Sequence, residues 1–181
     1  MKASKKILLI GVDGSGKTSL SQALAAYLDG RYLYLGEKYF CLKFLEKLNK
    51  ESRVVNIFYL IVLLPLDLYF RWNAVRRSKV LLVDRVPSWS WSKNRLLRFI
   101  YNLALPRFDC VVFCTGSVEV FFERKREKSI QLLHKDNEKW RRFFNDVQAP
   151  VKIELDTSRQ TLEESLLLVY NQIYNSVLVD V

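Results

Sequence analysis

Five short apolar runs are spaced along the chain, separated by longer stretches with helical periodicity. In order, they are residues 7–10, 32–35, 80–83, 110–114 and 151–155. The first four are uninterrupted, which is typical of strands buried on both faces, whereas the fifth alternates apolar and charged residues. The runs therefore predict five strands.

The stretches between these runs predict helices, because apolar residues recur in them every three or four positions. After Lys17, Leu20, Leu24 and Leu28 follow this spacing, and Gly30 ends the run as a C-terminal glycine does. We expect Pro65 to kink or break the third helix. Because strands alternate with helices, the pattern predicts an α/β fold, a five-stranded parallel sheet with helices on both faces. The predicted helices are residues 17–28, 39–49, 54–77, 93–105, 118–128, 137–147 and 162–177.

The turn after the first strand, residues 11–18, has the sequence Gly-Val-Asp-Gly-Ser-Gly-Lys-Thr, which matches the phosphate-binding pattern G-x-x-x-x-G-K-[ST]. The apolar run before it and the helical pattern after it are the context that this motif requires. The glycines let backbone N–H groups converge on phosphate oxygens, Lys17 reaches the terminal phosphates, and the Thr18 hydroxyl holds Mg²⁺. The loop predicts a nucleotide-binding site formed by Gly11, Asp13, Gly14, Ser15, Gly16, Lys17, Thr18 and Ser19.

Asp84 and Arg85 directly follow the third predicted strand. Open parallel sheets bind ligands outside the carboxyl ends of their strands, so we expect both side chains beside the loop. A carboxylate there organises a metal ion through its water shell, and a guanidinium binds a phosphate group through two nitrogens. The alternative is a salt bridge at the end of the strand.

The composition suits one globular domain, residues 1–181, because half of the 181 residues are hydrophobic. Three cysteines without a C-x-x-C spacing argue against a disulfide framework or zinc ribbon and favour the cytoplasm. The single histidine, His134, is expected in a solvated loop rather than at a zinc site. The apolar run at 57–64 is shorter than the roughly 20 residues that span a bilayer, so we expect a buried helix there.

The net charge of +10 is concentrated in the middle of the chain. Residues 71–142 contain 17 basic and 7 acidic residues, whereas the remainder contains 12 of each. This excess favours an anionic partner, which is a phosphorylated small molecule, a nucleic acid or an acidic membrane surface. Composition does not distinguish among these three.

The motifs, taken in order, resemble those of the thymidylate kinase-like P-loop kinases, a branch of the nucleoside-monophosphate kinases. Residues 11–18 resemble that family's loop in their Gly-x-Asp-Gly-x-Gly-Lys-Thr form, and residues 80–85, Val-Leu-Leu-Val-Asp-Arg, resemble its third strand ending in Asp-Arg. Four further segments are more loosely similar. Residues 108–113 resemble the family's fourth strand, and residues 117–126 resemble the helix that enters its lid. Residues 152–157 resemble its last strand, and residues 161–164 its last helix.

The resemblance implies a three-layer P-loop NTPase fold and ATP-dependent phosphoryl transfer to a small phosphorylated acceptor, a nucleoside monophosphate, with ATP and Mg²⁺ as cofactors. Lys17 and the loop amides would bind the donor. Thr18, together with Asp84 through water, would hold Mg²⁺. Asp13 would approach the acceptor's sugar hydroxyl, and Arg85 would bind its phosphate.

The same resemblance implies a lid at about residues 124–138. Arg124 and Arg126 would close over the transferring group, which makes them catalytic together with Lys17, Asp84 and Arg85. Phe70 and Arg71 would bind the acceptor's base, with a core or surface role as the alternative. The helical region 54–77 would form a homodimer interface.

The sequence departs from the family pattern where the acceptor would bind. Residues 86–91 after Asp-Arg are Val-Pro-Ser-Trp-Ser-Trp, and the Glu-Pro expected after the second strand is absent. The acceptor is therefore open between a nucleoside monophosphate and a non-nucleotide acceptor such as a sugar. A different class of function is a nucleotide-dependent protein that docks on nucleic acid or an anionic membrane. Its candidate docking residues are Lys93, Arg95, Arg98, Arg107, Arg141 and Arg142.

Overall fold

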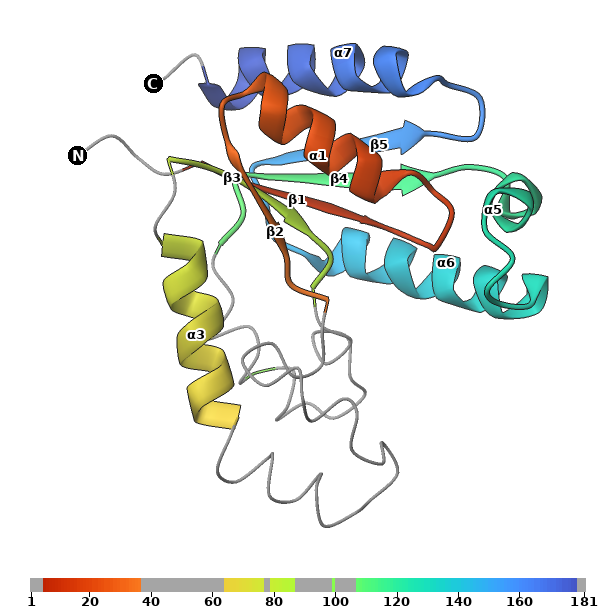
Figure 1. The fold of residues 1–181 in the computed structure, drawn as a ribbon, viewed down its shortest axis with the longest axis horizontal. Helices are drawn as coiled ribbons and strands as arrows, with labels where there is room; N and C mark the ends of the chain where they lie inside the picture. The colour runs from red at the N-terminus through yellow and green to blue at the C-terminus, as the bar shows by residue number, and fades with distance from the viewer. Residues whose placement is uncertain (1–4, 37–63, 77–78, 87–98, 100–106, 179–181) are drawn as a thin grey trace. The chain divides into compact units, whose positions relative to one another are not determined.

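The computed structural model describes residues 5–36, 64–76, 79–86, 99 and 107–178 (Figure 1). Contacts divide the chain into two compact units. The first unit, residues 1–34, 78–85 and 107–181, contains the sheet and the glycine-rich loop. The second unit, residues 35–77 and 86–106, contains helix α3.

The first unit is built on a five-stranded, all-parallel sheet with the order β2-β3-β1-β4-β5. All five predicted strands are therefore confirmed, and β2 lies one residue earlier than predicted. In chain order the strands are β1 (Lys5–Gly11), β2 (Arg31–Tyr34), β3 (Val80–Asp84), β4 (Cys110–Thr115) and β5 (Val151–Asp156).

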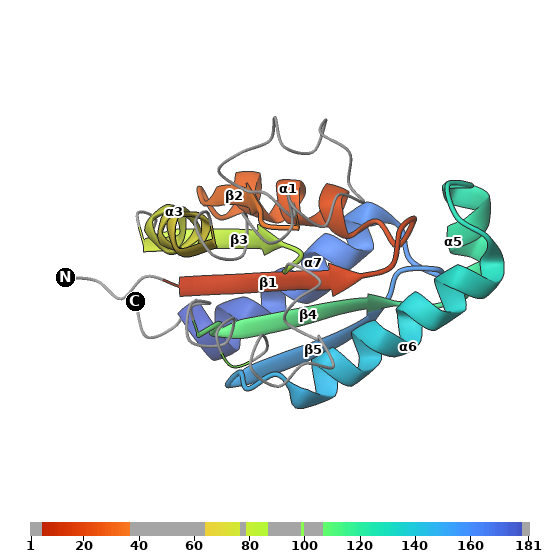
Figure 2. The ribbon, with the colours of Figure 1, turned by 90° about the horizontal axis from the view of Figure 1, so that it is seen from below.

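Helices cover both faces of this sheet, which confirms the predicted three-layer α/β fold. Helices α1 (Lys17–Tyr27) and α7 (Leu162–Ile173) pack on one face, and α6 (Ile130–Asp146) packs on the other (Figures 1 and 2). A π-helical segment, Tyr174–Leu178, continues α7. The central strands are apolar throughout because both of their faces are buried. Residues of the core beneath α1 and α7 include Ile7, Leu9, Leu24, Leu82, Val112, Val169 and Ile173.

The structure differs from the predicted helices at 118–128 and 137–147. Helix α5 (Val118–Arg124) ends early because Lys125 is extended, with φ −152° and ψ 95°. Helix α6 begins early because the Ser129 hydroxyl accepts a hydrogen bond from the backbone N–H of Leu132 and caps it. His134 therefore lies on an exposed face of α6, and the predicted loop position was wrong. The predicted lid begins at the last residue of α5 and runs through the first half of α6; its closure stays a prediction.

The second unit is described mainly by α3 (Leu64–Arg76). Its centre carries a buried ion pair one turn apart, in which Arg71 Nε donates to Asp67 Oδ2 at 2.9 Å. Arg71 Nη1 also donates to the carbonyl oxygen of Leu35 at 2.7 Å. Of the predicted helices, 39–49, the first part of 54–77 and all of 93–105 except Phe99 lie outside the described residues, so the dimer interface stays a prediction. No helix in the described ranges is long and apolar enough to cross a bilayer.

Candidate functional site

The glycine-rich loop joins the carboxyl end of β1 to the first residue of α1, as predicted. Two of its glycines have left-handed backbones that side chains rarely adopt, Gly14 with φ +82° and Gly16 with φ +74°. A Cβ atom at Gly14 would also collide with the backbone carbonyl oxygen of Phe121 in α5. The loop therefore needs glycine at both positions. At Gly14 it packs directly against α5.

Lys17, the first residue of α1, is buried within this loop. Its Nζ donates a hydrogen bond to the carbonyl oxygen of Val12 at 2.9 Å and lies 3.9 Å from Asp13 Oδ1. Burial, together with the nearby Arg85 cation, lowers the pKa of Lys17 to about 8. A buried ammonium with three donors and one hydrogen bond to the described residues has donors left for an anionic ligand.

Thr18 and Asp84 are brought together as predicted. The Thr18 hydroxyl donates to Asp84 Oδ2 at 2.6 Å, and the hydroxyl of Tyr32, on β2, donates to the same oxygen at 3.1 Å. Asp84 is completely buried, and its other oxygen, Oδ1, has no hydrogen-bond partner in the described part of the chain. A buried carboxylate oxygen that lacks a donor, next to a hydroxyl oxygen, is a donor set that suits Mg²⁺ and its bound water.

Asp13 is the centre of a cluster of cations. Arg85, which has a left-handed backbone with φ +66°, forms an ion pair with Asp13 Oδ1. Lys128, from the connection between α5 and α6, lies 2.9 Å from Asp13 Oδ2 and 2.9 Å from Asp136 Oδ2. Burial alone would raise the pKa of Asp13, but the Lys128 and Arg85 cations outweigh it and hold that pKa well below its usual range.

The two predicted lid arginines have different surroundings. Arg124 Nη1 donates to the carbonyl oxygen of Thr157 at 2.9 Å, which ties the end of α5 to the loop after β5. Arg126 is 68% exposed and pairs with Glu123 on the surface of α5. The structure thus brings Arg124 to the glycine-rich loop but not Arg126, whose catalytic role stays a prediction.

The predicted acceptor residues Phe70 and Arg71 belong to the second unit, whereas the loop belongs to the first. Arg71 is buried against Asp67 and Leu35, and Phe70 is exposed, with its ring edge-on to Tyr69. These contacts fit the core and surface roles of the alternative, and acceptor binding by the pair stays a prediction.

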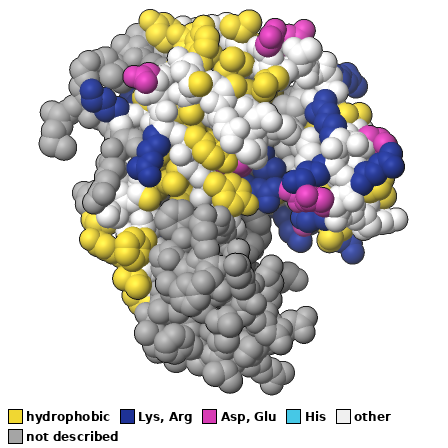
Figure 3. All heavy atoms as spheres, viewed as in Figure 1, with side chains coloured by type: hydrophobic (Ala, Val, Ile, Leu, Met, Phe, Trp, Pro, Cys, Tyr) yellow, Lys and Arg dark blue, Asp and Glu magenta, His cyan; other side chains and the backbone are white. Residues whose placement is uncertain are grey.

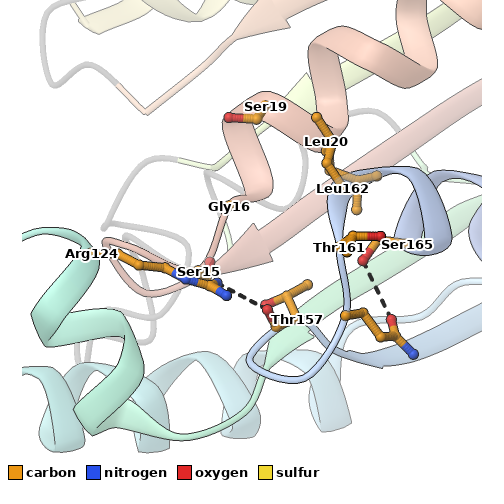
Figure 4. Close-up of a pocket in the computed structure, with 10 residues that line it drawn as sticks. Ser15, Gly16, Ser19, Leu20, Arg124, Thr157, Thr161, Leu162 and Ser165 are labelled. Atoms are coloured by element: carbon orange, nitrogen blue, oxygen red, sulfur yellow. Dashed lines mark hydrogen bonds between the residues drawn. The ribbon is translucent and has the colours of Figure 1, made fainter.

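Two hollows adjoin at the loop and share Gly16, Ser19 and Arg124. The first, here called the phosphate pocket, has a volume of about 260 Å³ and is lined by Asp13, Gly14, Gly16, Lys17, Thr18, Ser19, Arg85, Arg124 and Lys125. The second, the adjoining pocket, has a volume of about 340 Å³ and is shown in Figure 4. It is lined by Ser15, Gly16, Ser19, Leu20, Arg124, Thr157, Gln160, Thr161, Leu162 and Ser165.

Sequence reasoning missed two parts of this site, Tyr32 and the wall of the adjoining pocket formed by residues 157–165. It placed Lys128 within the predicted lid but gave it no contact with Asp13. For that wall a signal was present, because the carboxyl end of the fifth strand lies at the same edge of the sheet as those of β1 and β3. Lys128 and Tyr32 reach the site through tertiary packing, which no local pattern reports.

The surplus basic residues are partly accounted for by internal pairs. Arg141 Nη1 lies 2.9 Å from Glu154 Oε1, and Arg142 Nη2 lies 3.8 Å from Glu138 Oε2. Figure 3 shows basic and acidic side chains interspersed over α5 and the adjacent part of α6. Arg107 is exposed, and Lys93, Arg95 and Arg98 lie outside the described residues. Docking on an anionic polymer or membrane stays a prediction.

Comparison with known proteins identifies the fold. No family model matches the chain, and no curated protein does. Among solved structures, the chain is similar to a deoxyadenosine kinase from M. mycoides with bound products, at 17% identity and a TM-score of 0.63, covering 94% of this chain and 99% of that one.

Two further similar structures are kinases named for sugars or their acids. A gluconokinase from Sinorhizobium meliloti 1021 has 18% identity and a TM-score of 0.57, covering 97% of this chain and 94% of that one. A sugar kinase from Janibacter sp. HTCC2649 has 17% identity and a TM-score of 0.55, covering 97% of this chain and 96% of that one. At these identities the likeness shows the fold alone, the parallel α/β fold that this chain shares with the three kinases.

Proposed function

We propose that this protein transfers the γ-phosphoryl group of ATP to a small phosphorylated acceptor. The observation that carries the proposal is the convergence of Arg85 and Lys128 on Asp13 at the edge of a phosphate-binding loop. Phosphoryl transfer needs positioned cations more than a nucleophilic side chain, because negative charge must be neutralised on donor and acceptor alike.

The donor would occupy the two adjoining pockets. Its phosphates would bind the loop amides and Lys17 in the phosphate pocket, and its nucleoside would lie in the adjoining pocket, which Leu20 and Leu162 line. Arg124 lines both pockets and would contact the donor at their junction. A similar structure, the deoxyadenosine kinase, has been solved with bound dATP, which supports a nucleotide in a fold of this kind.

Thr18 and Asp84 would hold Mg²⁺, Thr18 through its hydroxyl oxygen and Asp84 through water. The fit rests on the unpartnered Oδ1 atom of Asp84 and on the hydrogen bond that turns the Thr18 proton toward Asp84. That bond leaves the lone pairs of the Thr18 oxygen to face a cation. When bound, Mg²⁺ would neutralise charge on the donor phosphates.

The surroundings of Asp13 favour a phosphorylated acceptor over a hydroxyl acceptor. Transfer to a hydroxyl is assisted by a general base that takes its proton. Asp13 is a weak base because Lys128 and Arg85 hold its pKa low, and Asp84 is engaged by two hydroxyl donors. An acceptor phosphate already carries the attacking oxygen as an anion and would bind the same two cations. Within this class we propose a nucleoside monophosphate, as the thymidylate kinase-like motifs suggest.

A second candidate is an unphosphorylated acceptor, a sugar acid or a nucleoside. It is supported by the names of the similar structures, which are gluconokinase, sugar kinase and deoxyadenosine kinase. This candidate requires a general base other than Asp13.

Paired acceptors separate the two candidates. ADP release would be measured with dTMP against thymidine, dAMP against deoxyadenosine, and 6-phosphogluconate against gluconate, for wild type and Lys17→Met. We expect turnover with a phosphorylated member and loss of that turnover in Lys17→Met. Faster turnover with the unphosphorylated member of a pair would favour the second candidate. No acceptor-stimulated release from a folded, nucleotide-binding sample across the panel would contradict both.

A further inference from the structure

The hydroxyl of Tyr32 reaches Asp84 from the neighbouring strand. Tyr32 lies on β2 opposite Leu82 of β3, two residues before Asp84, and its hydroxyl donates to Asp84 Oδ2 at 3.1 Å. The ring packs against the core beneath α1, so the phenol has little freedom to move. A phenol is a hydrogen-bond donor at neutral pH, so it can donate to the Asp84 carboxylate.

The two oxygens of Asp84 have unequal surroundings. Oδ2 accepts from both Tyr32 and Thr18, whereas Oδ1 is buried without a partner in the described part of the chain. A carboxylate held by one donor can rotate and exchange its oxygens. Two donors that converge on one oxygen from different elements, β2 and α1, fix the plane of the group and keep Oδ1 available.

We infer that Tyr32 is a positioning residue, which orients Asp84 so that Oδ1 accepts from the water shell of the nucleotide-bound divalent cation. The inference rests on the proposed function, because it assumes that the cation binds at Thr18 and Asp84. Tyr32 itself touches neither the cation nor the nucleotide. It acts by preventing the rotation of Asp84 that Thr18 alone would permit.

Tyr32→Phe tests this role, because it removes the hydroxyl and keeps the ring in the core. Tyr170→Phe is a matched control, since Tyr170 is half-buried against the same core and packs edge-on against Tyr27. The affinity for a non-hydrolysable ATP analogue would first be measured in EDTA. Mn²⁺ would then be titrated into each protein–nucleotide complex, with free Mn²⁺ followed by electron paramagnetic resonance.

We expect Tyr32→Phe to weaken Mn²⁺ binding in the complex about tenfold, the lower end for loss of a residue that orients a metal-site carboxylate. Nucleotide affinity in EDTA should stay within about twofold of wild type, and Tyr170→Phe should match wild type in both measurements. A lower melting temperature with unchanged Mn²⁺ affinity would show a merely structural role and overturn the inference. Failure of wild type to bind the nucleotide would overturn the proposed function as well, so the two failures are distinguishable.

Discussion

Lys128 Nζ lies 2.9 Å from Asp13 Oδ2, so the connection between α5 and α6 is tied to the phosphate-binding loop by an ion pair. The same ammonium lies 2.9 Å from Asp136 Oδ2 on α6. Lys128 is therefore already positioned at the loop and shared between two carboxylates. An incoming phosphate that carries two negative charges can compete with Asp13 for this cation, whereas a neutral hydroxyl cannot.

Lys128→Met should lower kcat/KM for the phosphorylated acceptor by about 10- to 100-fold, the effect of losing one charged hydrogen bond to a phosphate. Nucleotide affinity should change little, because the proposed donor site consists of Lys17 and the loop amides. Steady-state kinetics and a nucleotide titration measure the two effects. Lys135→Met, which removes an exposed lysine from the first half of α6, serves as the control. Equal kinetics for the two variants would contradict a role for Lys128.

Sequence alone predicts the sheet, the glycine-rich loop and the place of Asp84 because these depend on local pattern. The run Ile7–Ile10, which ends in a glycine-rich turn, is typical of a strand buried on both faces, and the glycines after it permit the backbone angles that the loop adopts. Asp84 is placed correctly because parallel strands end at one edge of the sheet. These features require no knowledge of distant contacts.

The remaining parts of the site depend on contacts between segments far apart in the chain. Lys128 and Asp13 are 115 positions apart in the chain. Lys128 lies outside a helix because α6 begins only after its cap at Ser129. A run of charged residues at 123–128 has helical composition, so composition alone continues α5 too far. The sequence does not distinguish the surroundings of Arg124 and Arg126. In the structure Arg124 donates to the carbonyl oxygen of Thr157, whereas Arg126 pairs with Glu123.

Lys17→Met should abolish turnover without destabilising the fold. Burial and the nearby Arg85 cation lower the pKa of Lys17, which means that the folded state disfavours its positive charge, so losing that charge should cost little stability. Without that charge the donor phosphates lose a preorganised cation, so kcat/KM should fall by at least about 100-fold. Calorimetry and the ADP-release assay measure the two outcomes. A melting temperature several degrees lower than that of wild type would show that Lys17 supports the fold instead.

Gly14→Ala and Gly16→Ala should differ in stability although both glycines have left-handed backbones. At Gly16 a Cβ atom meets nothing within 4 Å, so the cost is the backbone strain of about 1–2 kcal/mol. At Gly14 the Cβ also meets the Phe121 carbonyl oxygen, which should add about 1–3 kcal/mol. Urea denaturation of both variants measures the difference in the free energy of unfolding. Equal losses in the free energy of unfolding would mean that α5 moves away from Gly14 at little cost.

Asp13→Asn should make the free energy of unfolding fall less in acid than it does in wild type. The folded-state pKa of Asp13 lies below its usual value, so its ion pairs with Arg85 and Lys128 stabilise the protein fully above about pH 4. As the pH falls through the folded-state pKa, the carboxylate is protonated and this stability is lost. From pH 5 to pH 2, wild type should lose about 1–2 kcal/mol more than Asp13→Asn, allowing for partial solvent screening. Urea midpoints across this range measure the difference, with the exposed Asp146→Asn as the control. If the urea midpoint of Asp13→Asn falls as much as that of wild type down to pH 2, the ion pairs of Asp13 with Arg85 and Lys128 do not stabilise the fold.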